Sequence, residues 1–269
     1  MSTAHNPIRL FETVVDECPY LDNQQSASIL VDPEHDIDTA LFSSLSRSGF
    51  RRSGEMLYTP KCPSCNACVS VRIPSDQFKA SKSQKRGWRK NNDLRVSLES
   101  VRFEQEHFDM YFRYQQHRHP ESSMCDDDVE KYISFIDSSY SRSQFLTFRL
   151  DGLLIGISVL DQFEGGLSAV YTFFEPEFSN RSLGTYAILY ALKLAKAHQI
   201  AHVYLGYWID SSGKMDYKRK FKPLQGYQER QWRELELWPL KTAQKRPTTV
   251  ISHLKRRLKA LFIRTLGAW

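Results

Sequence analysis

Three consecutive apolar runs, each the length of a β-strand, constrain the fold of this 269-residue chain more than any other feature. The runs are Phe145 to Leu150, Leu153 to Asp161 and Leu167 to Phe174. Only Asp151-Gly152 separates the first two, and this dipeptide is typical of a tight hairpin turn. A long apolar stretch over 182–198 then predicts a helix, and another strand is expected over 202–209.

Two helices are expected before these strands. One begins near residue 104 and ends before His119-Pro120, and the other begins near the acids at 126–128, which suit a helix N-terminus. Helices, antiparallel strands, a helix and a further strand predict an α/β (α+β) fold, in which a mixed sheet is flanked by helices. This order resembles the acyltransferase fold of the N-acetyltransferases.

The turn before the long helix is a candidate anion site. Arg181-Ser182-Leu183-Gly184-Thr185 stands where that fold offers backbone amides to a pyrophosphate. Tyr186 replaces the final small residue of the cofactor-binding turn, so the motif is incomplete as a coenzyme A site.

Charge is segregated along the chain. The net charge is +6, yet residues 79–95 hold seven Lys or Arg against one acid, and residues 241–269 hold eight against none. An otherwise acidic chain with two basic segments favours polyanion binding, most simply a nucleic acid, over two merely solvated helix faces. No apolar run approaches a membrane span and no signal-peptide pattern opens the chain, so we expect a cytoplasmic protein without membrane partners.

Cysteines cluster ahead of the first basic segment. Cys62, Cys65 and Cys68 are evenly spaced, and Cys18 could supply a fourth thiolate. Zinc, an iron–sulfur cluster and reduced structural thiols all remain open, although the spacing does not match a two-pair zinc site. We predict neither a metal nor a cofactor. The composition divides the chain into a Cys-containing basic subdomain (1–103), an acyltransferase-like catalytic domain (104–245) and a basic amphipathic C-terminal helix (246–269).

Several motifs together resemble one family. They are Arg52-Ser53-Gly54, Tyr58-x-Pro60-x-Cys62-Pro63-x-Cys65-x-Ala67-Cys68, Ser81-x-Ser83-Gln84-Lys85-Arg86, Asn92-Asp93-Leu94, Arg118-His119-Pro120, Leu167 to Phe174, Arg181 to Thr185, Tyr204 to Ile209, and Lys214-Met215-x-Tyr217-Lys218. Over nearly the whole chain, this set resembles the bacterial branch of the arginyl-tRNA–protein transferase family.

The resemblance implies an aminoacyltransferase that moves leucine from leucyl-tRNA to proteins with N-terminal Asp or Glu and so marks them for N-degron degradation. An arginyl-tRNA donor is an alternative. So are a CoA-dependent N-acetyltransferase and a non-catalytic RNA-binding module. Glu175-Pro176-Glu177 departs from the family's Asp-Pro-Asp, which lengthens each carboxylate by one methylene.

An aminoacyl ester is already activated, so the enzyme need only align it with the amine, stabilise the oxyanion and move a proton. The reaction is expected where strands 167–174 and 202–209 separate. There Glu175 would accept the proton, and Tyr171 or Tyr207 would donate to the oxyanion.

Two further groups of residues are expected to bind the substrates. The predicted tRNA contacts are Lys82, Lys85, Arg86, Arg89, Lys90, Arg181 and Gly184. The predicted acceptor contacts are Arg52, Arg72, Lys214 and Lys218, and Arg51 is a further candidate for the acceptor's carboxylate.

Overall fold

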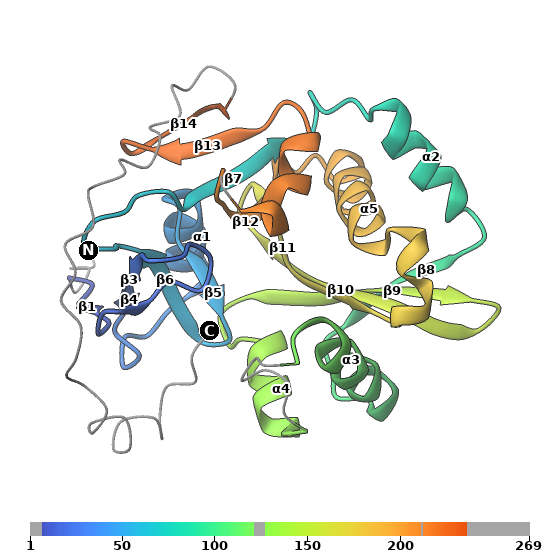
Figure 1. Cartoon of the computed structure of the whole chain (residues 1–269), viewed down its shortest axis with the longest axis horizontal. Helices are drawn as coiled ribbons and strands as arrows, with labels where there is room; N and C mark the ends of the chain where they lie inside the picture. Colours follow the sequence, from blue (N-terminus) through green and yellow to red (C-terminus); the bar gives the residue numbers. More distant parts are fainter. Residues whose placement is uncertain (1–6, 121–126, 211, 236–269) are drawn as a thin grey trace, which may run out of the picture.

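An eight-stranded sheet forms the centre of the molecule. The computed structural model describes residues 7–120, 127–210 and 212–235. The strand order of the sheet is β14-β13-β7-β12-β11-β10-β9-β8 (Figure 1). The strands are β7 (Val69–Pro74), β8 (Arg95–Ser100), β9 (Arg142–Leu150), β10 (Leu153–Phe163), β11 (Gly166–Phe174), β12 (His202–Trp208), β13 (Gln225–Gln228) and β14 (Gln231–Glu234). Neighbours are antiparallel except β11 and β12, which are parallel.

The mixed sheet and its flanking helices confirm the predicted fold class. The central strand β10 is buried along nearly its whole length, and its residues are mostly apolar because both of its faces are covered. Phe145 and Phe173 pack on one face, whereas Phe148 and Ile155 belong to the core on the other.

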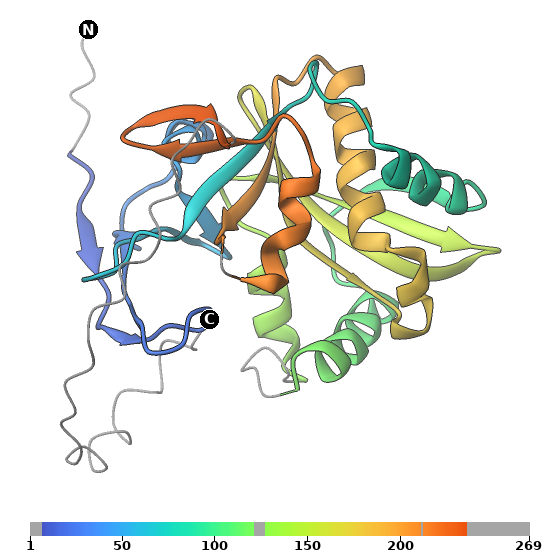
Figure 2. The same ribbon diagram turned by 45° about the horizontal axis from the view of Figure 1, so that its top comes forward.

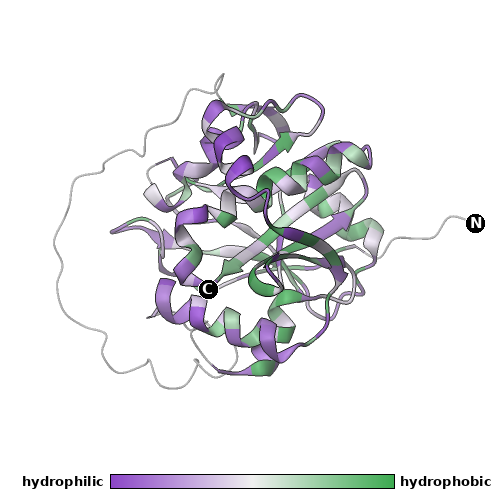
Figure 3. Cartoon of the chain, turned by 90° about the vertical axis from the view of Figure 1, so that its right-hand side faces the viewer, coloured by the Kyte–Doolittle hydropathy of each residue, from purple (hydrophilic) through white to green (hydrophobic). Residues whose placement is uncertain are grey.

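Two helical layers cover the sheet. Figure 1 shows α5 (Leu183–Ala197) and α2 (Lys82–Lys90) on one face, and α3 (Gln105–Arg118) and α4 (Val129–Ile136) on the other. The helices carry both hydrophilic and hydrophobic residues along their length (Figure 3). None of the described helices is long and apolar enough to cross a membrane.

The N-terminal segment forms a separate small sheet, in the order β1-β4-β6-β5. Its strands are β1 (Leu10–Glu12), β4 (Ser28–Val31), β5 (Arg51–Ser53) and β6 (Met56–Pro60), with a β2 (Asp16–Glu17) and β3 (Gln25–Ser26) ladder and the helix α1 (Thr39–Arg47) nearby. The sequence analysis did not predict strands β1 to β4, which are two to four residues long. Because β7 and β8 belong to the large sheet, the predicted boundary at residue 103 falls within that sheet. The predicted helix over 246–269 lies outside the described residues.

Strands β11 and β12 separate after a short parallel contact. Gly166 to Ser168 pair with His202 to Tyr204, and the two strands continue beyond this point without pairing. The β12–β7 register also shifts between Tyr204 and Tyr207, where Gly206 adopts a φ of 77° that favours glycine. The 3-10 helix η2 (Gly213–Lys220, orange) lies beside this end of β12, as Figures 1 and 2 show.

Candidate functional site

A cavity of about 980 Å³ opens where β11 and β12 separate. Its wall includes residues from β5, β6, the end of α3, β11, the start of α5, β12 and η2. The N-terminus of α5 reaches the cavity through Leu183, Gly184 and Thr185, whose amides precede the first intrahelical bond of the helix. None of the side chains that the structure describes caps this end, so its backbone donors suit an anion.

The cavity wall is strongly cationic. Its described residues include five Arg or Lys side chains and one carboxylate, that of Asp161. The cations are Arg51, Arg52, Arg118, Lys214 and Lys218. His117 and His119 also line it. Such a wall attracts anionic substrates.

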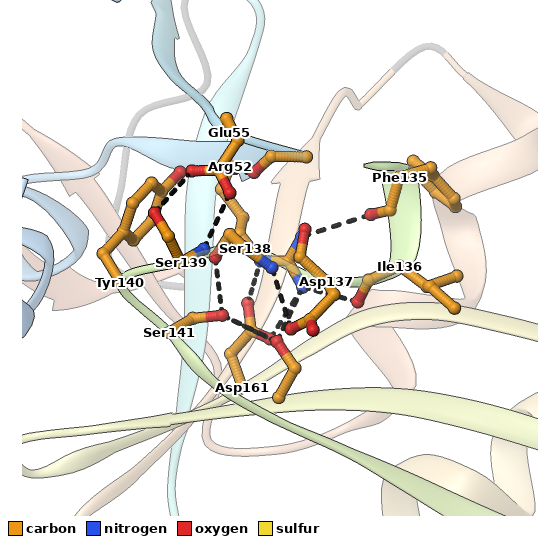
Figure 4. Close-up of polar contacts among 12 residues, drawn as sticks. Arg52, Glu55, Phe135, Ile136, Asp137, Ser138, Ser139, Tyr140, Ser141 and Asp161 are labelled. Atoms are coloured by element: carbon orange, nitrogen blue, oxygen red, sulfur yellow. Dashed lines mark hydrogen bonds and ion pairs between the residues drawn. The ribbon is translucent and has the colours of Figure 1, made fainter. Parts of the chain in front are cut away.

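The Arg52 side chain is bound by groups of the protein itself (Figure 4). Its Nε and Nη2 both donate to the Asp161 carboxylate, with Nη2 at 2.8 Å from Oδ1. The same guanidinium donates to the carbonyl oxygens of Phe135 at 3.2 Å and Ile136 at 3.0 Å. Burial alone would lower the pKa of Arg52, but the Asp161 contact outweighs burial and raises it. We therefore revise its predicted role from acceptor contact to structural support.

Arg51 and Lys218 differ from Arg52 because neither has a carboxylate partner among the residues the structure describes. Both are buried, with exposed fractions of 7%. Arg51 donates to main-chain carbonyls and to the Ser70 hydroxyl, and Lys218 Nζ donates to the Tyr207 carbonyl. Burial lowers the pKa of Arg51, and burial together with Arg51 lowers that of Lys218 to about 8.

The three predicted catalytic residues occupy different positions. Tyr171 lines the cavity, with its hydroxyl 3.4 Å from Gln115 Oε1, and burial raises its pKa. Tyr207 also lines it, but its hydroxyl donates to the carbonyls of Gly49 at 3.0 Å and Tyr58 at 3.2 Å. Burial raises the pKa of Tyr207 to about 12.

Glu175 is the third, and it lies outside the cavity wall. Arg113 of α3 holds both of its carboxylate oxygens, with Nη2–Oε1 at 2.5 Å and Nε–Oε2 at 3.1 Å. Both carboxylate oxygens are therefore engaged by the Arg113 guanidinium. This geometry favours a positioning role for Glu175.

The remaining predicted binding residues divide between the cavity and other contacts. Gly184 and Lys214 line the cavity. Arg181 instead binds both oxygens of Asp93, each at 2.9 Å. Arg72 lies outside the wall, donates to Gln225 and Tyr204, and stacks 4.3 Å from the centroid of the Trp232 ring. Arg72 and Arg181 thus support the fold, and their predicted substrate contacts are not favoured.

The predicted tRNA-binding cations lie on α2. Lys82, Lys85, Arg86, Arg89 and Lys90 are all exposed. Ser81 and Gln84 form a capping box that starts the helix, and Trp88 stacks on Tyr190 of α5. The helix is therefore held by its apolar face, with its cations towards solvent.

The four described thiols lie close together. Burial, then the neighbouring thiols of Cys62, Cys18 and Cys65, raises the pKa of Cys68 to about 12. Within the described ranges, no group of three or more His, Cys, Asp or Glu side chains is arranged to hold a metal ion.

The sequence analysis did not place the end of α3 in the site. Tyr114, Arg118 and His119 all line the cavity. Burial, then Arg118 and Lys214, lowers the pKa of His119, so its imidazole is neutral at pH 7. The Arg118-His119-Pro120 motif was the available signal, but its place beside β11 depends on tertiary packing.

The mixed sheet, with an uncapped helix start facing a cavity between separated strands, defines an acyltransferase-like fold. Sequence comparison makes this specific. The C-terminal domain of arginine-tRNA-protein transferase matches residues 106–228, and its N-terminal domain matches residues 16–86. The chain belongs to the arginine-tRNA-protein transferase family.

Within that family the chain is similar to proteins named aspartate/glutamate leucyltransferase. The one from Hahella chejuensis (strain KCTC 2396) is 45% identical over 208 residues, covering 77% of this chain and 89% of that protein. The one from Marinobacter nauticus (strain ATCC 700491 / DSM 11845 / VT8) is 41% identical over 225 residues, covering 84% and 95%. Among solved structures, L-PGS from Bacillus licheniformis covers 60% of this chain and 58% of its own, with a TM-score of 0.43 and 14% identity.

Proposed function

We propose that this protein transfers leucine from leucyl-tRNA to the α-amine of proteins that begin with Asp or Glu. The cationic cavity beside the uncapped start of α5 is the observation that carries this proposal. Both substrates carry negative charge near the reacting atoms. In the tRNA, phosphodiesters adjoin the terminal ribose that bears the ester, and in the acceptor protein the first residue has a carboxylate side chain. The family and the names of its relatives agree with this pairing.

The donor approaches along one side of the cavity. Exposed cations of α2 bind the tRNA backbone, and the α5 amides bind an anionic group at its aminoacylated end. Gln84 Nε2 donates to the Lys220 carbonyl, and Asn91 Nδ2 donates to the Arg181 carbonyl. These bonds join α2 to η2 and to the residues just before α5, so α2 is positioned relative to the cavity.

The reaction is an aminolysis of the ester. The neutral α-amine attacks the leucyl carbonyl carbon, the ribose C–O bond breaks, and an amide replaces the ester. The amine loses one proton and the ribose oxygen gains one, so no net proton is consumed. An α-amine with a pKa of about 7.7 to 8.0 is partly neutral at pH 7. Alignment in the cavity therefore supplies much of the rate.

His119 is our candidate for moving that proton. Its imidazole lines the cavity and is neutral at pH 7, whereas Glu175 lies outside the wall and pairs with Arg113. A neutral imidazole accepts the amine proton and can return it to the ribose oxygen. Tyr171 and the α5 amides, which also line the cavity, are our candidates for donating hydrogen bonds to the developing oxyanion.

The deciding experiment offers separately charged leucyl-, arginyl- and phenylalanyl-tRNA to peptides that differ only in their first residue. We expect transfer of leucine to peptides that begin with Asp or Glu, and little transfer to those that begin with Lys or Ala. Acetyl-CoA in place of the tRNA should give no product. Failure of all three tRNAs with Asp and Glu peptides would refute the proposal, and preferred transfer from arginyl-tRNA would change the donor.

A further inference from the structure

Arg51 carries an unoccupied edge suited to one carboxylate. Its Nη1 donates to the carbonyl oxygens of Ser46 at 3.2 Å and Phe50 at 2.5 Å, and its Nη2 donates to the Ser70 hydroxyl. Within the part of the chain that the structure describes, the buried Nε has no hydrogen-bond partner, and Nη2 has a second N–H to donate. Together, Nε and Nη2 form the edge of a guanidinium that binds a carboxylate through two bonds.

Arg52 shows the same edge in its occupied state. Its Nε and Nη2 donate to the two oxygens of Asp161. The two arginines are adjacent on β5, where successive side chains point to opposite sides of the strand. Both arginines line the cavity, but Arg52 is paired with Asp161, whereas Arg51 has no carboxylate partner among the described residues.

The surroundings hold Arg51 in place. Its guanidinium carbon lies 5.1 Å from the centroid of the Tyr204 ring and 6.0 Å from that of Tyr207. Stacked aromatic rings leave the edge of a guanidinium free for hydrogen bonding. Burial of an arginine without an acid is costly, so retaining one here indicates that an anion completes the site.

Lys218 adds a second buried cation to the same part of the cavity. It lines the wall from η2, and its charge interacts with that of Arg51. Its ammonium donates one bond, to the carbonyl of Tyr207, and the described residues supply no carboxylate for its other N–H groups. The positive φ of Gly206 shapes the β12 bulge just before that carbonyl. A Cβ added to Gly206 would lie 3.9 Å from Lys218 Nζ, so the ammonium lies on the side of the bulge where a side chain at position 206 would point.

We propose that Arg51 and Lys218 together bind the side-chain carboxylate of the acceptor's first residue and so make the enzyme selective for Asp and Glu. This inference rests on the proposed function and names its specificity determinants. Arg51 supplies the two-bond edge, and Lys218 supplies a point charge. The guanidinium edge would also match a phosphate, but the exposed cations of α2 and the α5 amides already offer donors to the tRNA phosphates. The acceptor's carboxylate is therefore the anion left for Arg51 and Lys218.

The test compares peptides that differ by one atom group, Asp against Asn and Glu against Gln at the first position. We would measure kcat/KM for each peptide and KM for leucyl-tRNA in the wild type, Lys218→Met and Arg51→Lys. Lys196→Met, which removes an exposed charge near the end of α5, serves as the control. Arg51→Lys keeps the charge but loses the two-bond edge.

We expect each site variant to lower kcat/KM for the Asp peptide by about 10- to 100-fold, the size of one lost charge-assisted hydrogen bond. Slow transfer to the Asn peptide should be unchanged, so the Asp-to-Asn ratio falls by the same factor. Lys218→Met should fold, because burial of the Lys218 charge opposes folding at neutral pH. Equal losses for Asp and Asn peptides, or a raised KM for leucyl-tRNA with the ratio kept, would overturn the inference.

Calorimetric titration of the peptides without tRNA separates this inference from the proposed function. The wild type should bind the Asp peptide more tightly than the Asn peptide, and Lys218→Met should remove the difference. If the wild type transfers nothing yet binds the Asp peptide through these residues, the function is wrong and the site stands. If it transfers leucine but binds both peptides equally, the function stands and the site is wrong.

Discussion

Arg52 and Asp161 form a buried ion pair that joins β5 of the small sheet to β10 of the large sheet. Main-chain carbonyls at the end of α4 bind the same guanidinium, so three elements meet at one side chain. The pair consequently holds the part of the cavity wall formed by β5 in place relative to the part formed by the large sheet and α4.

Removing one partner of this pair should destabilise the protein strongly. Arg52→Met leaves the Asp161 charge buried, and Asp161→Asn leaves that of Arg52, so each should lower the free energy of unfolding by about 3 to 5 kcal/mol. Urea denaturation measures the change. The double variant Arg52→Met/Asp161→Leu should lose less than the sum of the single losses. Strict additivity would show that the two charges do not depend on each other.

Glu175 and His119 should respond differently to neutral replacement. Glu175→Gln weakens an ion pair with Arg113, whose side chain is about half exposed, so we expect transfer to fall by less than about tenfold and the free energy of unfolding by about 1 kcal/mol. His119→Asn should lower kcat at pH 7 by about 100-fold, the low end for a positioned base. Single-turnover transfer rates with saturating leucyl-tRNA make the comparison. A larger loss of transfer rate in the Glu175 variant than in the His119 variant would assign the role of proton acceptor to Glu175 instead.

The cations of α2 should contribute to tRNA affinity through counterion release. Lys85→Met and Arg89→Met each remove one exposed charge, and each should reduce the slope of log K against log salt by about 0.7 to 0.9. Filter binding of leucyl-tRNA from low to moderate salt gives the slopes. Arg142→Met, which removes an exposed cation from β9, should leave the slope unchanged. Equal slopes in all three variants would place the tRNA elsewhere.

Gly184→Asp should change stability and transfer in opposite directions. Among the described residues, no atom lies within 4 Å of a Cβ built at Gly184, and replacing a helical glycine by aspartate gains about 0.3 kcal/mol in helix propensity. The new carboxylate also stabilises the start of α5. The same charge repels an anionic tRNA end, so the melting temperature should rise while KM for leucyl-tRNA increases. Gly184→Asn is the uncharged control, and an equal KM in both variants would exclude an anion at this helix end.

Transfer to Asp peptides should be greatest near pH 8. Below that, kcat/KM falls as the peptide's α-amine, with a pKa of about 7.7 to 8.0, becomes protonated. Above it, Lys218 loses its charge, since burial and Arg51 lower its pKa to about 8, and kcat/KM should then fall about tenfold per pH unit. The other groups around Lys218 keep their charge state in this range: Arg51 stays protonated, and burial raises the pKa values of Tyr207 and Tyr217 to about 12.

The alkaline limb of this profile identifies Lys218. In Lys218→Met the decline above pH 8 should disappear, while the rise below it remains. Peptides that begin with Asn should show no decline even with the wild-type enzyme, because they do not require the Lys218 charge. A decline shared by Asp and Asn peptides would assign the limb to another group.

The large sheet could be predicted from sequence because its strands are long, apolar and separated by clear turns. The hairpin at Asp151-Gly152 and the long helix α5 have the expected places. Strands β1 to β4 escaped prediction because they are two to four residues long and lack a buried alternating face.

The candidate site was less predictable than the fold. Lys218 and Gly184 could be selected from motifs, but motifs cannot tell which cations already have partners. Arg52 and Arg181 look like substrate contacts in sequence, yet Asp161 and Asp93 occupy their guanidinium groups. Those acids are more than eighty residues from their partners, so only tertiary structure distinguishes an occupied arginine from an available one.

Two buried amides set the geometry of the donor. Gln84 and Asn91 have exposed fractions of 4% and 0%, and they bond α2 at one end to η2 and at the other to the turn that starts α5. If α2 binds the tRNA as proposed, these two bonds fix the position of the bound tRNA relative to the cavity. The distance from α2 to the cavity is therefore fixed. A charged RNA with a different distance between its backbone phosphates and its aminoacyl ester would bind α2, but its ester would not reach the cavity.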